Sequence, residues 1–182
     1  MSRAPSGILP PMTSAIVQVE IAEATAADRA FIRNVYPLYL HDLSPFTAFY
    51  DLDERGVFFP DYLPDWLDVE SPLVHPLILR ADGRPAGFAF VGEAPFPHMT
   101  AGRDFRMAEF FILARYRRRN VGQRAAHAIF DRFRGVWEVC QLPANVPAVR
   151  FWRSVIGDYT GGLFEDTIEK GDIVQVFDNG AP

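Results

Sequence analysis

A basic segment at residues 115–124 has the composition of an anion-binding turn. It reads Arg-Tyr-Arg-Arg-Arg-Asn-Val-Gly-Gln-Arg, follows an apolar stretch and precedes a helical pattern. Backbone N–H groups at such a turn point at whatever lies in front of the helix, where the helix dipole adds positive potential. Asn120 and Gly122 tolerate the left-handed conformations that form a nest of N–H donors. The segment therefore predicts a site for a phosphorylated ligand, with an ordinary solvated basic turn as the alternative.

One carboxylate, Glu109, stands at the start of the apolar stretch 109–113 that precedes this turn. A carboxylate inside a sheet is costly unless it is paired or functional. Glu109 is therefore a candidate general base. The alternative is that it points outward, or pairs with Arg106 or with an arginine of another element.

Hydrophobic periodicity and turn residues predict the elements that must position these groups. The predicted order is a strand at 16–21, a helix after Thr25, short helices and loops over 44–72, strands at 76–81, 85–92 and 109–113, a helix at 121–133, a strand at 136–141, a helix at 145–156, and strands at 163–168 and 173–177. This order predicts an α/β protein with a mixed sheet and helices on both faces. Residues 1–13, with three prolines, are expected to be a flexible leader, and residues 14–182 a single domain.

Bulk composition narrows the classes of function. The chain has 182 residues, of which 49% are hydrophobic, and its single cysteine, Cys140, excludes an internal disulfide. With no apolar segment of membrane-spanning length, this composition predicts a cytoplasmic protein without a membrane partner. A net charge of −5 argues against binding to nucleic acid. The four histidines show no metal-ligand spacing with one another or with Cys140, so no metal site is expected.

Acidic and aromatic residues concentrate in segment 42–70, which carries eight acids against one base, Arg55. Carboxylates attract a cationic amine, and aromatic faces add cation–π contacts. The segment is therefore a candidate for binding a cationic substrate. The alternative is a solvated acidic flap whose aromatic side chains belong to the core.

Two segments resemble the GNAT family of N-acetyltransferases. Residues 109–122 resemble its acetyl-CoA signature, a strand followed by [Gln/Arg]-x-x-Gly-x-[Gly/Ala] and a helix, with Asn120 in place of the middle glycine. Residues 145–152 resemble its Asn-x-x-Ala-x-x-x-Tyr segment, with Trp152 in place of the tyrosine. The resemblance is clear over residues 76–178 and vague before them.

The resemblance implies a GNAT fold, a three-layer domain with a mixed, mostly antiparallel sheet that splays between its fourth and fifth strands. It also implies acetyl-CoA as the cofactor, without a metal. The implied cofactor contacts are Phe110, Phe111, Ile112, Arg117, Arg118, Arg119, Asn120, Val121, Gly122, Gln123, Arg124, Asn145, Phe151 and Trp152.

The implied reaction is direct transfer of an acetyl group to a primary amine of a small polar or cationic molecule. Tyr36, Tyr39 and His41 lie where the family places acceptor-lining residues. Acetylation of a protein N-terminus or lysine is an alternative, and so is a catalytically silent CoA-binding module. The resemblance also leaves a homodimer open, formed through the terminal hairpin or a sheet edge.

In the family, the tyrosine at the position of Trp152 often serves as the general acid that protonates the departing thiolate. Trp152 puts this step in question, because an indole N–H donates hydrogen bonds but is no useful acid. Tyr159 or a water molecule is the candidate replacement. Alternatively no acid is needed, because a thiolate with a pKa of about 8.5 leaves tolerably unaided.

Overall fold

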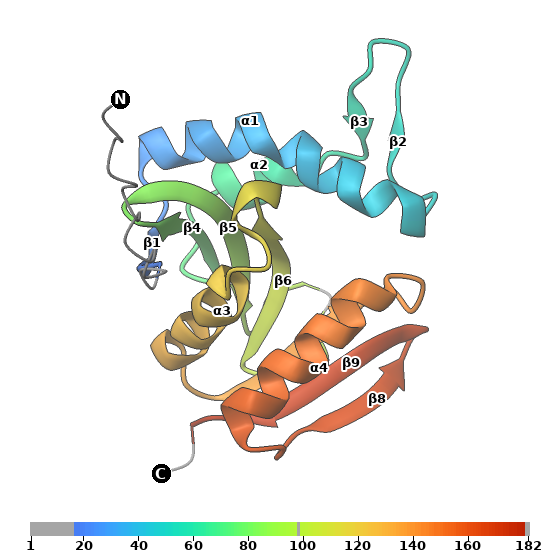
Figure 1. Cartoon of the computed structure of the whole chain (residues 1–182). Helices are drawn as coiled ribbons and strands as arrows, with labels where there is room; N and C mark the ends of the chain where they lie inside the picture. The colour runs from blue at the N-terminus through green and yellow to red at the C-terminus, as the bar shows by residue number, and fades with distance from the viewer. Residues whose placement is uncertain (1–16, 98, 181–182) are drawn as a thin grey trace, which may run out of the picture.

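The computed structural model of the chain describes residues 17–97 and 99–180 (Figure 1). The predicted leader at 1–13 and Ile16 lie outside the described residues. In chain order the elements are β1 (Val19–Glu23), α1 (Ala26–Leu43), the 3₁₀ helix η1 (Ser44–Phe46), β2 (Asp51–Leu52), β3 (Phe58–Phe59), α2 (Leu63–Leu67), β4 (Val74–Ala81), β5 (Arg84–Glu93), β6 (Phe105–Ile112), the 3₁₀ helix η2 (Ala114–Tyr116), α3 (Val121–Arg132), β7 (Val136–Gln141), α4 (Val146–Thr160), β8 (Glu165–Glu169) and β9 (Asp172–Asp178). Within these ranges, none of the helices has the length and apolarity needed to cross a membrane.

Seven strands form one mixed sheet in the order β1-β4-β5-β6-β7-β9-β8. Neighbouring strands are antiparallel, except for β6 and β7, which are parallel. This topology confirms the predicted mixed, mostly antiparallel sheet. The remaining two strands, β2 and β3, form a hairpin that projects from the body of the molecule (Figure 1).

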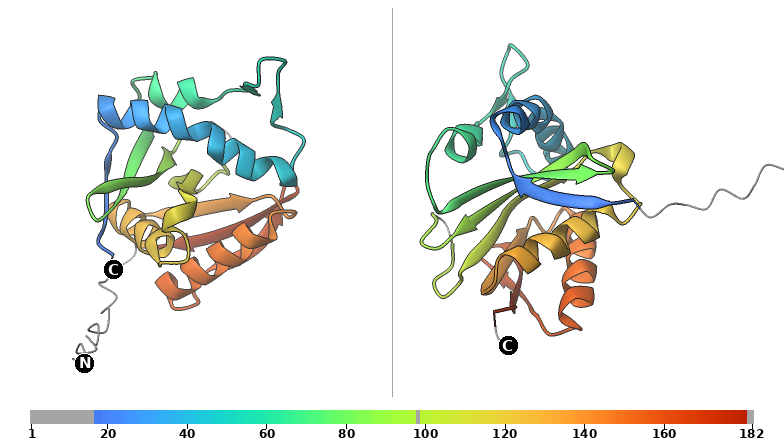
Figure 2. Two further views of the ribbon diagram at one scale, coloured as in Figure 1. Left: turned by 45° about the horizontal axis from the view of Figure 1, so that its top comes forward. Right: turned by 90° about the vertical axis from the view of Figure 1, so that its left-hand side faces the viewer.

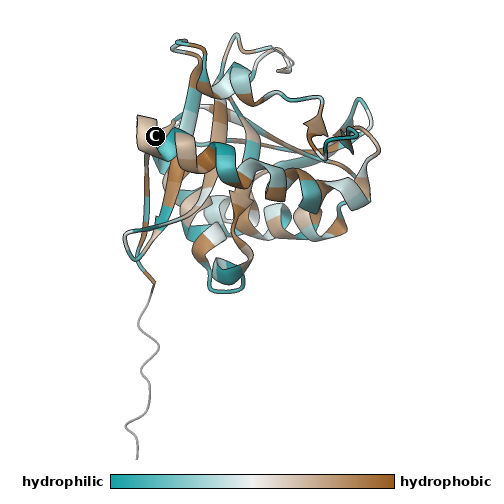
Figure 3. Ribbon diagram, turned by 90° about the horizontal axis from the view of Figure 1, so that it is seen from above, coloured by the Kyte–Doolittle hydropathy of each residue, from teal (hydrophilic) through white to brown (hydrophobic). Residues whose placement is uncertain are grey.

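Helices cover both faces of the sheet, as predicted (Figure 2). On one face, here named the α1 face, α1 and α2 pack through Ile32 and Trp66 against Phe88. On the opposite face, here named the α4 face, α3 and α4 pack through Ile129 and Trp152. Polar and apolar residues alternate along the helices (Figure 3), because each helix turns its apolar side to the sheet.

The start of α1 matches the capping box expected from the sequence. The Thr25 hydroxyl accepts a hydrogen bond from the Asp28 N–H, and the Asp28 carboxylate accepts one from the Thr25 N–H. These contacts satisfy backbone donors that a helix start would otherwise leave unpaired. They fix where α1 begins on its face of the sheet.

Strands β6 and β7 diverge soon after they pair. Their register joins only Phe105–Met107 of β6 to Trp137–Val139 of β7. Beyond Met107, β6 continues beside β5, while β7 continues beside β9. This opening confirms the predicted splay between the fourth and fifth strands of the sheet. Past it, the facing main-chain edges of the two strands have no strand partner.

A β-bulge in β6 determines which way its carboxylate points. The pairing with β5 shifts so that Ala108 has no direct partner on β5. Side chains of a regular strand alternate between the two faces, and an extra residue breaks this alternation. Met107 and Phe110 therefore pack on the α4 face, while Ala108 and Glu109 both lie on the α1 face.

The segment 44–72 is only partly as predicted. The short helices η1 and α2 occur where short helices were expected, but the hairpin β2–β3 was not predicted. Its strands have two residues each, which is too short to show an alternating pattern. The turn is held by the Asp53 carboxylate, which accepts hydrogen bonds from the N–H groups of Arg55 and Val57.

A substitution at Gly87 of β5 tests how closely β5 and β6 pack against each other. A Cβ at this position would lie 1.9 Å from the main-chain oxygen of Phe111 on β6. Gly87→Ala should therefore lower the free energy of unfolding by about 2–3 kcal/mol, measured by urea denaturation. The control is Gly157→Ala in α4, where a Cβ would meet only Phe164 at 3.6 Å. It should be neutral or stabilising by up to about 1 kcal/mol, and equal losses in both variants would contradict the packing.

Candidate functional site

The turn before α3 has the backbone of an anion-binding nest. Arg118 and Asn120 adopt left-handed conformations, with φ of 59° and 58°, and Asn120 is the N-cap residue of α3. The first N–H groups of any helix lack partners within the helix. Alternating left- and right-handed residues in front of them gather further N–H groups into a concave site for an anion.

Gly122 has a different role from the one expected. It lies within α3 and does not adopt a left-handed conformation. A Cβ at this position would lie 3.2 Å from Cζ of Phe151 on α4. The absence of a side chain at Gly122 therefore allows α3 and α4 to approach each other closely. The left-handed residues of the turn are Arg118 and Asn120.

The basic side chains of the turn divide into two groups. Arg118 and Arg119 are exposed beside the nest. The Nε of Arg117 donates a hydrogen bond of 2.7 Å to the main-chain oxygen of Ile112, and its guanidinium forms an ion pair with Asp42. The side chain of Arg117 is thus held by the protein.

Two further predicted cofactor contacts also have protein partners. Gln123 donates a hydrogen bond of 2.9 Å to Asp158, and Arg124 donates to the main-chain oxygen of Val17. Of the arginines expected at the cofactor, Arg118 and Arg119 are the two whose side chains form no hydrogen bond or ion pair with other described residues.

A cavity of about 310 Å³ lies at the opening between β6 and β7. Residues from both faces of the sheet line it. From the α1 face come Tyr39, Leu43, Thr47, Phe49, Tyr50, Ala108, Glu109 and Cys140, and from the α4 face come Met107, Phe110, Gln141, Asn145, Ala148 and Trp152; Arg106, Leu142 and Asp172 complete the lining. The cavity therefore connects the two faces through the sheet.

Glu109 lies in this cavity and is hydrogen-bonded by the hydroxyl of Tyr39. Burial raises the pKa of the Glu109 carboxyl from 4.5 to about 7, and the Tyr39 hydrogen bond and the Arg106 charge oppose this rise in part. Arg106 itself pairs with Glu138, at 3.0 Å. Glu109 thus neither points to bulk solvent nor forms the ion pair that was the alternative.

Of the three predicted acceptor residues, the structure brings one into the cavity. Tyr39 lines it, whereas Tyr36 lies beside it with a ring centroid 5.8 Å from that of Tyr39. The Tyr36 hydroxyl is buried and has no hydrogen-bond partner within the described part of the chain. His41 is exposed and does not line the cavity.

The segment 42–70 contributes aromatic side chains to the cavity, not carboxylates. Phe49 and Tyr50 line it, together with Thr47. The acidic residues that line it are Glu109 and Asp172, which come from other parts of the chain. No acidic residue of segment 42–70 lines the cavity, so the role of this segment in binding a cationic substrate stays a prediction.

An aromatic cluster closes the α4 face of the cavity. The ring of Phe110 stacks on Phe151 at 5.9 Å and meets Trp152 edge-on at 5.1 Å. Asn145 caps α4 by accepting a hydrogen bond from the Ala148 N–H. The neighbouring residues of β6 divide between the faces: Phe111 packs on the α1 face and Ile112 on the α4 face. Phe110, Asn145 and Trp152 line the cavity together with Glu109, whereas Phe111, Ile112 and Phe151 do not line it.

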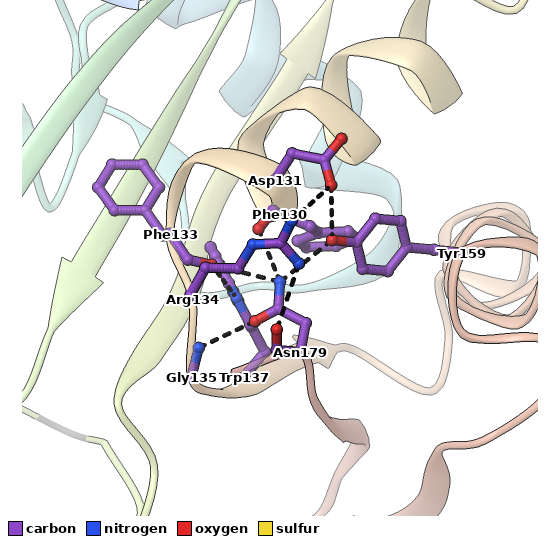
Figure 4. A network of polar contacts seen from close by, with 8 residues as sticks. All are labelled: Phe130, Asp131, Phe133, Arg134, Gly135, Trp137, Tyr159 and Asn179. Carbon is purple, nitrogen blue, oxygen red and sulfur yellow. Dashed lines mark hydrogen bonds and ion pairs between the residues drawn. The ribbon is translucent and has the colours of Figure 1, made fainter. Parts of the chain in front are cut away.

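Tyr159 does not lie at this cavity (Figure 4). Its hydroxyl donates a hydrogen bond of 2.9 Å to Asp131 and accepts one of 3.2 Å from Asn179. Tyr159 is two helical turns beyond Trp152, which corresponds to about 10 Å along α4. The position therefore gives no support to Tyr159 as the acid, and this expectation is corrected.

Several lining residues were not singled out from the sequence. Gln141 and Asp172 belong to strands whose neighbours follow only from the sheet order, and Arg106 was named only as a possible partner of Glu109. Cys140 also lines the cavity, and burial raises the pKa of its thiol to about 11. The thiol is therefore protonated at neutral pH, which agrees with a packing role.

Known proteins share this architecture. A family model described as the acetyltransferase (GNAT) family matches residues 32–157. An acetyltransferase from Thermus thermophilus has a TM-score of 0.63 and 16% identity, covering 90% of this chain and 98% of that chain. Aminoglycoside acetyltransferase AAC(6′)-Ib in complex with coenzyme A and kanamycin has a TM-score of 0.59 and 19% identity, covering 88% and 95%. The Escherichia coli ribosomal-protein-S18-alanine N-acetyltransferase has a TM-score of 0.55 and 12% identity, covering 91% and 96%. A search of curated protein sequences found no match.

The raised pKa of Glu109 predicts a pH-dependent loss of stability. Its pKa is higher in the folded protein than the 4.5 of an ordinary glutamate, so folding becomes less favourable as pH rises from 4.5 through 7. The loss should approach about 3 kcal/mol above pH 7. Glu109→Gln removes this titration. Its free energy of unfolding relative to that of wild type should therefore rise by about 3 kcal/mol between pH 4.5 and pH 8, measured by urea unfolding. The exposed Glu165→Gln is the control, and the same gain there, or none in Glu109→Gln, would contradict a buried carboxylate.

Proposed function

Since the chain belongs to the GNAT acetyltransferase family, we propose that it transfers an acetyl group from acetyl-CoA directly to a primary amine of a small polar or cationic molecule. The observation that carries the proposal is the position of Glu109. This partly buried carboxylate lies in a cavity that connects the α1 face, with its aromatic side chains, to the α4 face. A cavity of this size, lined by both polar and apolar side chains, suits a small molecule.

The residues present fit a nucleotide-containing cofactor at the α3 end of the site. The left-handed conformations of Arg118 and Asn120 turn main-chain N–H groups toward an anion, as a pyrophosphate requires. Gly122 lets the Phe151 ring of α4 pack against the first turn of α3, directly behind this turn. When bound, acetyl-CoA supplies the acetyl thioester. Phe110 and Trp152 form the wall beside it, which leaves little room for a longer acyl chain.

Glu109 is the proposed proton acceptor for the amine. An alkylamine has a pKa of about 10.4 and must lose a proton before it can attack. With a pKa of about 7, Glu109 is available as a base at and above neutral pH, directly or through a water molecule. The Tyr39 hydroxyl holds one carboxylate oxygen in place. The unpaired main-chain edge of β6 past Met107 offers N–H groups for the developing oxyanion.

No side-chain acid is assigned. Trp152 does not release a proton, and Tyr159 lies outside the cavity. We propose that the transfer proceeds without one, because a thiolate leaves without prior protonation more easily than an alkoxide would. The acceptor enters from the α1 face, where Phe49 and Tyr50 of the segment before β2 border the cavity.

Activity and its pH dependence test the role of Glu109. Release of CoA from acetyl-CoA should be measured against a panel of amines, with kcat/KM rising as pH passes through about 7 and the Glu109 carboxylate forms. Glu109→Gln should lower kcat/KM by about 10²–10⁴-fold, while Glu165→Gln stays near wild type. A Glu109→Gln variant that keeps most of its activity would overturn the assignment, and no CoA release with any amine would overturn the proposed function.

The nest can be tested by titration calorimetry with acetyl-CoA. Asn120→Gly retains access to the left-handed conformation and should bind as wild type, whereas Asn120→Val is strained there and should bind about tenfold more weakly. Arg119→Ala should also weaken binding, and Arg55→Ala in the distant hairpin turn is the matched control. If Asn120→Val binds like Asn120→Gly, the turn does not hold the cofactor.

A further inference from the structure

Arg106 brings a positive charge into the cavity lining, on the same strand as Glu109. Its neighbour Met107 packs on the α4 face, so Arg106 lies on the α1 face, where the bulge also places Glu109. A cation so close to a carboxylate usually forms an ion pair with it and lowers its pKa. The pKa of the Glu109 carboxyl is nevertheless about 7, because the effect of burial exceeds that of Arg106. The neighbouring strand explains why the effect of Arg106 is small.

Glu138 of β7 holds the Arg106 side chain. The two residues are direct partners where β6 and β7 still pair. Trp137 and Val139 on either side of Glu138 pack on the α4 face, so the Glu138 side chain lies on the α1 face with Arg106. Nη1 of Arg106 donates a hydrogen bond of 3.0 Å to Oε1 of Glu138. The guanidinium is therefore turned across the strand pair, toward β7.

The Glu138 carboxylate is itself fixed by its surroundings. Its side chain is 1% exposed, and Oε2 accepts a hydrogen bond of 3.3 Å from the N–H of Thr100, in the connection between β5 and β6. The Thr100 hydroxyl donates in turn to Glu169, which pairs with Arg103. A buried carboxylate is costly unless it is paired and hydrogen-bonded, and Glu138 is both. Glu138 does not line the cavity, so it can act there only through Arg106.

Titratable and charged groups surround Glu109 from several elements. They are Tyr36 and Tyr39 of α1, Tyr50 of the segment before β2, Arg106 of β6, Cys140 of β7 and Asp172 of β9. Burial raises the pKa of the three tyrosines and of Cys140, so these four groups are neutral at pH 7. Arg106 is the cation of this set. How far its charge is compensated therefore bears directly on whether Glu109 is ionised.

We propose that Glu138 is a positioning residue for the acetyl transfer, a role that rests on the proposed function: it holds and neutralises the Arg106 guanidinium, so that Glu109 does not become the ion-pair partner of Arg106. Glu109 then keeps the proton affinity that it needs to accept a proton from the amine. Without the charge of Glu138, Arg106 would attract the Glu109 carboxylate and stabilise its ionised form. Glu109 would ionise at lower pH and be a weaker base.

The test titrates the Glu109 carboxyl by carbon-13 NMR in the full-length protein. Glu138→Gln keeps the shape and an acceptor for Arg106 but removes the charge, so the Glu109 midpoint should fall from about 7 by about one pH unit or more. The midpoint of kcat/KM against pH should fall by the same amount. Glu169→Gln is the matched control, because it alters the contacts of Thr100 and Arg103 and not the ion pair of Arg106. It should leave both midpoints as in wild type.

A double-mutant cycle tests whether the effect passes through Arg106. In an Arg106→Gln background, Glu138→Gln should leave the Glu109 midpoint unchanged. If Glu138→Gln does not fold, Glu138→Asp, which withdraws the carboxylate from Arg106 by one methylene, should lower the midpoint by a smaller amount. An unchanged midpoint in the Glu138 variants, or an equal fall with and without Arg106, would overturn the positioning role. Failure of wild type to release CoA with any amine, with the NMR midpoint still falling in Glu138→Gln, would instead overturn the proposed function.

Discussion

The divergence of β6 from β7 is the constraint on which the rest of the site depends. Two neighbouring strands of a sheet normally satisfy one another's main-chain groups along their length. In this sheet they do so only up to Met107 and Val139, and each then remains paired on its outer side alone. The result is an opening in the middle of a rigid sheet. Side chains at the edges of this opening are held more precisely than they would be on a loop. The cavity, its aromatic wall and the unpaired main-chain edge all follow from it.

The bulge at Ala108 and Glu109 gives this opening its chemistry. In a regular strand Glu109 would share the α4 face with Met107, beside Trp152 and Phe110. The extra residue instead turns its carboxylate to the α1 face, where the Tyr39 hydroxyl meets it. A buried carboxylate with a pKa of about 7 is unfavourable for stability and useful for proton transfer. The fold therefore holds the proposed base on one face and the proposed phosphate-binding turn toward the other.

Local sequence signals were enough for most of the elements, the hairpin β2–β3 excepted, and for the turn. The capping box at Thr25 and the left-handed position of Asn120 follow from residue types and short spacings, and the structure has both. Relations between strands were harder to foresee. Whether Glu109 pointed outward or inward depended on a one-residue bulge, and the presence of Gln141 in the cavity lining depended on where β7 leaves β6. Tyr159 was placed by analogy of residue type alone, and the length of α4 carries it away from the cavity.

The central claim, that the opening holds a carboxylate with a strongly raised pKa, is tested most directly by titrating the Glu109 carboxyl itself. With the side-chain carboxyl carbons of glutamate labelled with carbon-13, NMR spectra of wild type recorded from pH 3 to pH 9 should contain one resonance with a midpoint near pH 7. Comparison with Glu109→Gln, in which that resonance should be missing, assigns it. A Glu109 resonance that titrates near 4.5 would mean that the carboxylate is exposed to water, and it would contradict the inward-turning bulge, the buried cavity and the proposed base together.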